Sequence, residues 1–229
     1  MPEEIPWPFS RFYDRFVNRT FIKWFNHIAE NVKDRQISGV ILDIGTGPGR
    51  LPIEIAKQVP DAEVIGIDLS EDMVRIANRN AEKEGLSTRV KFRVGSAYAT
   101  GFLDDSVDLV TSTGMIHHLQ EPISAFNEIH RILKGGAEAW IYDGRKDVTK
   151  TEFEETVRNL GMDELLPLRL WVIERIWPHL HTGFKTDEYS SGKIGRALEK
   201  SRIESFELSN EGAYMRITLR KARSSLSDI

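Results

Sequence analysis

The sequence predicts an α/β fold in which helices cover both faces of a doubly wound, mostly parallel sheet. Three observations carry this prediction. Short apolar runs rich in Val and Ile alternate with helix-like segments between residues 38 and 143, which is typical of parallel strands joined by crossover helices. The first run ends in a glycine-rich turn. Near the C-terminus, apolar runs at 203–208 and 213–219 flank a turn-forming segment, which favours a closing antiparallel hairpin.

The first 35 residues are expected to form a helix that precedes the sheet. Aromatic side chains recur there with the period of one helix face, at Phe9, Phe12, Tyr13 and Phe16. Because this bulky stripe lies outside the alternating pattern, we expect residues 1–35 to form an N-terminal helical lid.

The elements of the central region follow from their residues in order. Ser70 is a favourable N-cap for the helix after the second strand, and Gly85 ends that helix. Pro122 begins a later helix, which residues 134–136 are expected to close. The predicted strands are 40–44, 62–67, 90–94, 107–111 and 137–142, and the predicted helices between them are 48–58, 70–84 and 122–133.

Residues 145–186 interrupt the alternation. Helical patterns at 149–160 and 163–177 are together too long for a simple connection, and a further helix is expected at 186–201. We therefore predict a core domain at 36–144 and a helical insertion over the substrate at 145–186. Residues 187–229 are expected to complete a seven-stranded sheet whose last strand is antiparallel.

Composition limits the classes of function. The chain has 229 residues, enough for one domain with a full apolar core. It has no cysteine, which excludes disulfides, thiolate metal sites and a cysteine nucleophile. A net charge of −4 argues against nucleic acid or an anionic membrane as a partner. No leader pattern or membrane-length apolar stretch occurs, so we expect a soluble, cytoplasmic protein.

The most informative motif is residues 43–50, with the sequence DIGTGPGR. Its glycines allow a tight turn and a close approach of backbone to ligand. A dinucleotide fingerprint would need Gly where Arg50 stands, and the Lys of a phosphate-binding P-loop is missing. Asp43 just before the turn disfavours a pyrophosphate and suits a cationic group. Asp68, at the end of the next strand, is placed to accept hydrogen bonds from ribose hydroxyls.

Together these segments resemble the class I S-adenosylmethionine-dependent methyltransferases. The resemblance rests on residues 40–51, 64–70, 108–110 and 133–136 and covers about residues 38–143. Within that superfamily, residues 115–119 (MIHHL) resemble the small-molecule group that includes ubiquinone/menaquinone-biosynthesis C-methyltransferases. The resemblance implies a Rossmann-like fold and S-adenosyl-L-methionine as the cofactor.

The resemblance also implies which residues contact the cofactor. Asp43, Gly45 and Gly47 would line its methionine part, Asp68 would hold the ribose, and Leu69 and Met73 would flank the adenine. Where relatives have an acidic residue near the adenine, this chain has Ser96 followed by Ala97, so a hydroxyl or backbone contact is expected there. The complete predicted set is Asp43, Gly45, Thr46, Gly47, Asp68, Leu69, Met73, Ser96, Ala97 and Thr113.

Two residues are candidates for catalysis. His117 follows the fourth strand, at the mouth where ligands bind in open α/β sheets, and a base is needed when the methyl acceptor must lose a proton. Packing or helix capping is the alternative role for His117 and His118. Tyr13 would fold over the cofactor with the N-terminal lid, or would only pack in the aromatic stripe. His179 and His181 lack a third ligand, so no metal site is expected.

The acceptor is expected to be a small, partly apolar molecule. The apolar residues of 150–186 would roof an acceptor pocket, form a homodimer contact, or pack on the flank of the sheet. Two other functions stay open at this point. One is a non-catalytic S-adenosylmethionine-binding regulator. The other is a protein or tRNA methyltransferase, against which stand the net charge and the lack of an Asn/Asp-Pro-Pro-Tyr/Phe motif after the fourth strand.

Overall fold

The computed structural model describes residues 9–161 and 184–223 of the chain, with side chains from residue 21 onward. The helix expected at 163–177, the histidines at 179 and 181, and the side chain of Tyr13 therefore lie outside what is described. In the described part of the chain, no helix has the length and apolar character needed to cross a membrane.

The strands form one seven-stranded sheet in the order β3-β2-β1-β4-β5-β7-β6. The first five strands run parallel, and β7 is antiparallel to both β5 and β6. This arrangement confirms the predicted doubly wound sheet with an antiparallel closing hairpin. The strands are β1 (Val40–Ile44), β2 (Glu63–Asp68), β3 (Val90–Val94), β4 (Val107–Thr113), β5 (Leu133–Gly144), β6 (Ser205–Asn210) and β7 (Tyr214–Arg220).

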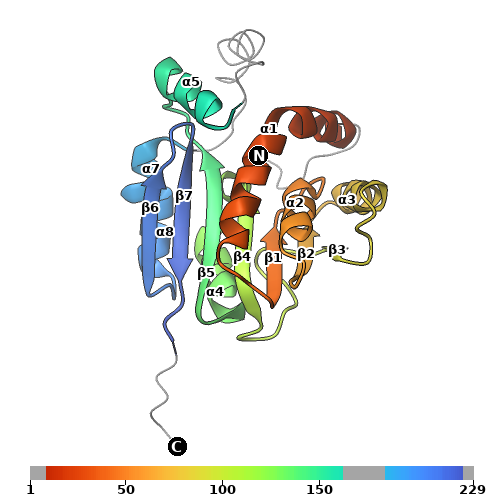
Figure 1. Ribbon diagram of the computed structural model, residues 1–229. Coiled ribbons are helices and arrows are strands. Elements are labelled where there is room, and N and C mark those ends of the chain that lie inside the picture. Colours follow the sequence, from red (N-terminus) through yellow and green to blue (C-terminus); the bar gives the residue numbers. More distant parts are fainter. Residues whose placement is uncertain (1–8, 162–183, 224–229) are drawn as a thin grey trace, which may run out of the picture.

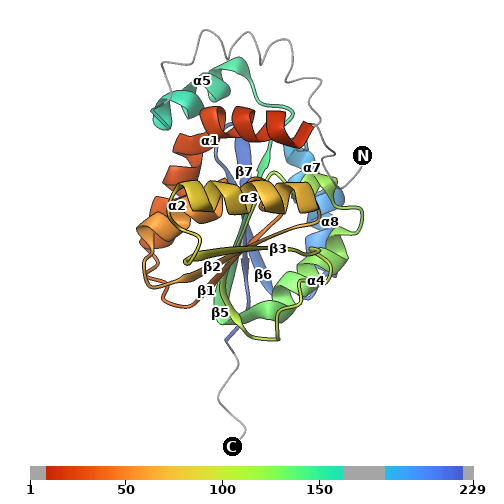
Figure 2. The ribbon, with the colours of Figure 1, turned by 90° about the vertical axis from the view of Figure 1, so that its right-hand side faces the viewer.

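Helices cover both faces of this sheet. The helices are α1 (Phe9–Lys33), α2 (Arg50–Gln58), α3 (Glu71–Lys83), η1 (Ile116–His118), α4 (Pro122–Ile132), α5 (Lys150–Asn159), α7 (Thr186–Ser190) and α8 (Lys193–Lys200). Residues of α1, α2 and α3 share one apolar core with Ile41 and Trp140 of the sheet. Residues of α4 and α8 share the other core with Val110 and Ile141. Figure 2 shows α2 and α4 on opposite sides of the sheet.

The carboxyl ends of the parallel strands lie at a single edge of the sheet. Register places Ile44 beside Ile67, and Thr113 beside Tyr142, so β1, β2, β4 and β5 finish close together. Figure 1 shows α5 and the N-terminal part of α1 above this edge. In open α/β sheets this is the edge where ligands bind.

Several element boundaries differ from the sequence predictions, and the clearest differences concern α2, α4 and β5. Helix α2 begins at Arg50 rather than at residue 48, because Gly49 has φ of +76° and belongs to the turn. Helix α4 ends at Ile132 and β5 starts at once. The predicted closing residues 134–136 therefore lie in the strand, where Gly136 N–H donates to the carbonyl of Lys221.

The predicted helix at 186–201 is two helices, α7 and α8. Gly192 breaks it with non-helical backbone angles, and the side chain of Glu188 accepts a hydrogen bond from Lys193 N. This bond satisfies one of the free N–H groups at the start of α8.

Candidate functional site

The glycine-rich turn between β1 and α2 is the first part of the site. Gly45, Gly47 and Gly49 all have positive φ, at 72°, 52° and 76°, a region that residues with a Cβ enter at a cost. Space is short as well. A Cβ on Gly45 would lie 2.6 Å from Cγ of Met115, and one on Gly49 would lie 2.6 Å from Cζ of Phe92. The turn therefore requires glycine for its backbone and for its close neighbours.

Asp68 ties this turn to the start of α3. Its Oδ2 accepts a hydrogen bond from Gly47 N at 2.8 Å, and its Oδ1 accepts one from Ser70 N at 2.9 Å. On the other side of the turn, the buried side chain of Asn80 donates to the carbonyl oxygen of Pro48 at 2.9 Å. These contacts hold the turn at the edge of the sheet.

Asp43 is a buried carboxyl group beneath the same turn. Only 1% of the residue is exposed, and the hydroxyl of Thr111 donates to its Oδ1 at 2.7 Å. Burial raises the pKa of Asp43 from 3.8 to about 7, outweighing the hydrogen bond, and the nearby charge of Asp68 adds to the rise. A cationic ligand group placed here would favour the ionised carboxylate.

The segment after β4 forms the opposite side of the site. Gly114 has φ of +65°, and a Cβ added to it would meet nothing within 4 Å. The side chain of Met115 packs against Gly45, since its Cγ would lie only 2.6 Å from a Cβ added to that glycine. His117 is held by Asp143 at the end of β5. Its backbone N donates to Oδ2 at 3.0 Å, and its Nδ1 lies 2.7 Å from Oδ1.

The residues expected at the adenine follow β2 and β3: Leu69 comes directly after β2, Met73 lies in the first turn of α3, and Ser96 and Ala97 come shortly after β3. Met73 is 2% exposed, and Leu69 is half-buried. Ser96 Oγ accepts a hydrogen bond from Tyr98 N at 3.1 Å, which leaves its hydroxyl hydrogen to donate elsewhere. Ala97 belongs to the apolar core behind this edge.

The structure thus brings most of the predicted cofactor residues to one edge. Asp43 stands two residues before Gly45, and Asp68 accepts a hydrogen bond from Gly47 N. Thr46 is 7% exposed within the turn. Thr113 ends β4 beside them. Three residues near this group were not among the predicted site residues: Thr111, Met115 and Asp143. An available signal pointed to Asp143, since it stands at the end of its strand as Asp43 and Asp68 stand at theirs.

A metal ion has no evident place among these residues. Within 9–161 and 184–223, no group of three or more His, Asp or Glu side chains is arranged to hold one.

Known proteins are similar to the part of the chain that contains most of the predicted cofactor residues. Residues 41–136 match the methyltransferase domain family. The chain is 37% identical over 101 residues to an uncharacterized methyltransferase of Schizosaccharomyces pombe, covering 42% of this chain and 36% of that protein. It is 30% identical over 122 residues to the ubiquinone/menaquinone biosynthesis C-methyltransferase UbiE of Geotalea uraniireducens, covering 53% of this chain and 52% of that protein. The matched part is thus about half or less of each relative.

The fold has a solved counterpart over nearly its whole length. A proposed S-adenosyl-L-methionine-dependent methyltransferase from Methanococcus maripaludis superposes with a TM-score of 0.70 and 25% identity, covering 95% of this chain and 94% of that one.

Proposed function

We propose a reaction for the whole chain from two observations: residues 41–136 match the methyltransferase domain family, and the chain has the fold of the class I S-adenosylmethionine-dependent enzymes. The chain transfers a methyl group from S-adenosyl-L-methionine to a small, partly apolar molecule. The observation that carries the proposal is the unit built from Asp43, the turn at 45–49 and Asp68. It joins a buried carboxyl group, a glycine turn and a second carboxylate at the ligand-binding edge of the sheet.

The residues present suit this cofactor. It supplies an electrophilic methyl group on a sulfonium centre and carries an ammonium group as well. Asp43 offers a negative charge whose ionised form a nearby cation would stabilise. Gly45 and Gly47 leave backbone exposed to a ligand, and the half-buried Asp68 provides a carboxylate of the kind that accepts hydrogen bonds from ribose hydroxyls.

The remaining contacts are part of the same proposal. Leu69 and Met73 flank the adenine, and Ser96 with Ala97 meets its polar edge through a hydroxyl or the backbone. Thr46 and Thr113 complete the wall around the methionine part.

The chain's own contribution to catalysis is positioning and exclusion of water. Transfer needs the nucleophile, the methyl group and the leaving sulfur in line, which a rigid enclosed site favours. We assign the enclosure to residues 1–35, with Tyr13, and to residues 145–186. The position of α5 above the carboxyl edge supports the second assignment. His117 is assigned to remove a proton from the acceptor.

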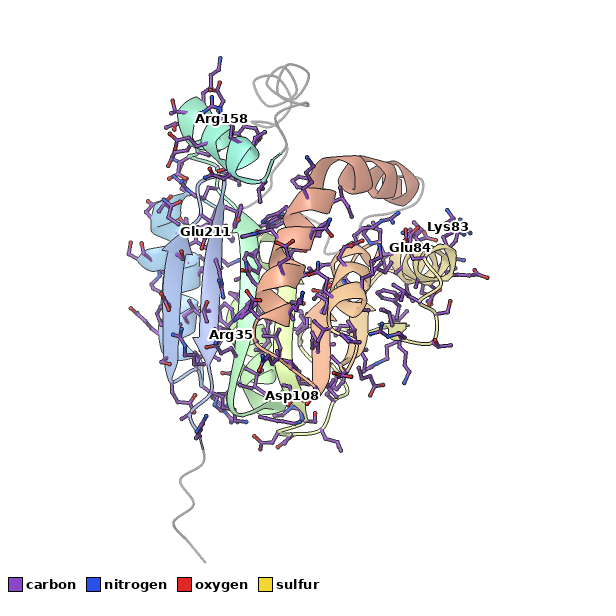
Figure 3. All side chains as sticks on the ribbon, viewed as in Figure 1. Arg35, Lys83, Glu84, Asp108, Arg158 and Glu211 are labelled. Carbon is purple, nitrogen blue, oxygen red and sulfur yellow. The ribbon has the colours of Figure 1, made fainter. Side chains whose placement is uncertain are left out.

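Calorimetry with S-adenosylmethionine and S-adenosylhomocysteine tests the proposal. We expect both to bind, and we expect Asp68→Ala to weaken binding by about 1–3 kcal/mol through lost charge-assisted hydrogen bonds. Asp108→Asn is the matched control. Asp108 accepts hydrogen bonds from Val40 N and Lys134 Nζ, and Figure 3 labels it at the opposite end of the sheet. No binding of either ligand to the wild type at millimolar concentration would refute the proposal.

Turnover separates an enzyme from a binding protein. Methyl-labelled cofactor incubated with a panel of small metabolites is expected to label an organic product. Binding without transfer to any small molecule, protein or tRNA in the panel would favour a regulatory role instead.

A further inference from the structure

Arg145 is a buried arginine at the point where β5 ends and the insertion at 145–186 begins. Only 5% of the residue is exposed. Its backbone N donates to the carbonyl of Ala213 at 3.1 Å, and its main chain forms a parallel bridge with Phe184. A buried charge is rarely left without hydrogen-bonded partners, so the groups around this guanidinium indicate what it holds together.

The Nε atom of Arg145 connects the two ends of the insertion. Its single N–H is shared between Oδ1 of Asp147 at 3.3 Å and Oγ1 of Thr186 at 3.0 Å. These two partners also contact each other, because Asp147 accepts the backbone N–H and the hydroxyl of Thr186, each at 3.0 Å. Beside them, Lys146 N donates to the carbonyl of Phe184 at 3.0 Å. The chain therefore enters and leaves the insertion at adjacent positions, with Arg145 bonded to both.

The Nη1 atom of Arg145 reaches α5 and the hairpin of β6 and β7. It donates to Oε1 of Glu152, in the first turn of α5, at 2.8 Å. It also donates to Oδ1 of Asn210, the last residue of β6, at 3.0 Å and to the carbonyl oxygen of Gly212 at 2.6 Å. A planar guanidinium holds several acceptors in fixed directions. One side chain thus links α5 to the closing hairpin of the sheet.

Thr156 fastens the next turn of α5 to the same hairpin. Its Oγ1 accepts a hydrogen bond from Ala213 N at 3.0 Å and donates to the carbonyl of Glu152 at 2.8 Å. Gly212 has φ of +77°, and a Cβ added to it would lie 2.2 Å from Oγ1 of Thr156. The hairpin turn therefore approaches α5 without room for a side chain. In Figure 1, α5 lies at this end of β6 and β7.

The carboxylates of this cluster stay ionised and are partly open to water. Hydrogen bonds from Thr149 and Arg145 lower the pKa of Glu152 to about 2. Although burial opposes it, hydrogen bonds from Thr186 and the charge of Arg145 lower the pKa of Asp147. The side chains of Asp147 and Glu152 are 36% and 33% exposed, against 6% for Arg145. Without the guanidinium both carboxylates would regain water, so the attachment of α5 should weaken more than the core of the sheet.

We propose that Arg145 is the positioning residue that holds α5 over the carboxyl edge as a fixed wall on the acceptor side of the site. The inference rests on the proposed methyltransferase function, which assigns the insertion to enclosure of the site. The contacts of Arg145 join the end of β5, α5, the start of α7 and the hairpin. The cofactor residues Asp43 and Asp68 belong to β1 and β2, and β4 separates these strands from β5. Loss of Arg145 should therefore weaken acceptor binding and leave cofactor binding nearly unchanged.

Amide hydrogen exchange of the wild type and Arg145→Met, followed by mass spectrometry, tests the attachment without any acceptor. We expect peptides of α5 to exchange at least about tenfold faster in the variant, with α2 and α3 at the wild-type rate, because local opening breaks only the contacts of α5. Arg220→Met is the matched control. It removes a guanidinium of the same hairpin that pairs with Glu138 and Glu207, and α5 should exchange there as in the wild type.

Thr156→Val tests the same attachment without removing a buried charge. Valine keeps the shape of threonine but cannot accept the N–H of Ala213, so α5 should again exchange faster, by about threefold or more. This variant decides the question where Arg145→Met yields no folded protein. Wild-type exchange of α5 in either folded variant overturns the inference, and so does faster exchange throughout the sheet in Arg145→Met.

Binding and kinetics give the functional readout. Affinity for S-adenosylhomocysteine, measured by calorimetry, should change less than about threefold in Arg145→Met. With labelled S-adenosylmethionine and the panel compounds that the wild type methylates, KM for the acceptor should rise about tenfold or more, while KM for S-adenosylmethionine changes less than about threefold. Arg145→Lys should resemble Arg145→Met, because an ammonium group cannot reproduce the planar fork. Full rescue by lysine would leave charge alone as the cause and overturn the positioning role.

The possible failures are distinguishable. Normal cofactor binding and methyl transfer in the wild type, with an unchanged acceptor KM in Arg145→Met, refutes the inference and leaves the methyltransferase function intact. A fall in S-adenosylhomocysteine affinity as large as the rise in acceptor KM also refutes it, because Arg145 would then act on the cofactor. Absence of both cofactor binding and methyl transfer in the wild type refutes the proposed function, and the acceptor part of the inference with it.

Discussion

Replacing Asp43 by Asn should remove a pH-dependent cost from the folded, ligand-free protein. The carboxyl is 1% exposed, and burial raises its pKa from 3.8 to about 7. The difference is about three pH units, and each unit corresponds to about 1.4 kcal/mol, so the ionised side chain lowers the free energy of unfolding by about 4 kcal/mol. Asn keeps an oxygen that can accept the hydroxyl of Thr111.

The sign and the pH window follow from the two pKa values. Below pH 3.8 the carboxyl is protonated in both the folded and unfolded states. Between pH 3.8 and 7 the unfolded chain releases the proton while the folded protein retains it, so stability falls as pH rises and levels off above pH 7. Several other carboxyl groups, such as Glu128 and Glu152, have lowered pKa values and act in the opposite direction at lower pH.

Urea unfolding at pH values from 5 to 8 gives the measurement, with the wild type and Asp43→Asn compared at each pH. Because the other groups are common to both proteins, the difference between their free energies of unfolding isolates Asp43. We expect the variant to gain about 3 kcal/mol relative to the wild type over this range. In Asp108→Asn, the change in the free energy of unfolding between pH 5 and 8 should stay close to that of the wild type. Parallel stability curves for Asp43→Asn and wild type would refute the reasoning.

Three further predictions concern the same turn and its ligand. Gly45→Ala should destabilise the protein by about 2 kcal/mol, because alanine is strained at positive φ and its Cβ would contact Met115. The double variant with Met115→Ala should relieve only the contact, which gives a coupling energy of about 1 kcal/mol in urea unfolding. Additive effects of the two substitutions would contradict this contact. Asn80→Ala should cost about 1–3 kcal/mol by leaving the Pro48 carbonyl without its donor, and a loss under about 0.5 kcal/mol would exclude that role. Binding of S-adenosylmethionine near pH 6 should release a proton from Asp43. The proton release is detected by calorimetry, because the heat of binding then varies with the ionisation enthalpy of the buffer. A heat of binding that is the same in all buffers would argue against proton release.

The local motifs were readable from the sequence because their geometry is local. Glycines at 45, 47 and 49 are spaced by the turn itself, and the structure gives all three positive φ. Strands β1 and β3 have the predicted bounds because their apolar runs end at clear turn residues. Ser70 caps α3 as predicted, accepting a hydrogen bond from Met73 N.

The predicted ends of some helices and strands were wrong where tertiary contacts compete with local propensity. The helix predicted to reach residue 133 stops at Ile132 because Leu133 pairs with Val107 of β4. The interruption between α7 and α8 likewise depends on close packing: a Cβ on Gly195 would lie 1.8 Å from the carbonyl oxygen of Ser190.

The order of strands and helices along the chain could be predicted from the sequence alone, and so could the glycine turn and two carboxylates, Asp43 near the end of β1 and Asp68 at the end of β2. Which side chains those residues contact became visible only in the folded chain. Asp43 receives its hydrogen bond from Thr111, 68 positions away, and Asp143 meets His117 across 26 positions. The physical reason is the sheet. Neighbouring strands in space are distant in sequence, and their register, set by packing on both faces, selects which side chains share the carboxyl edge.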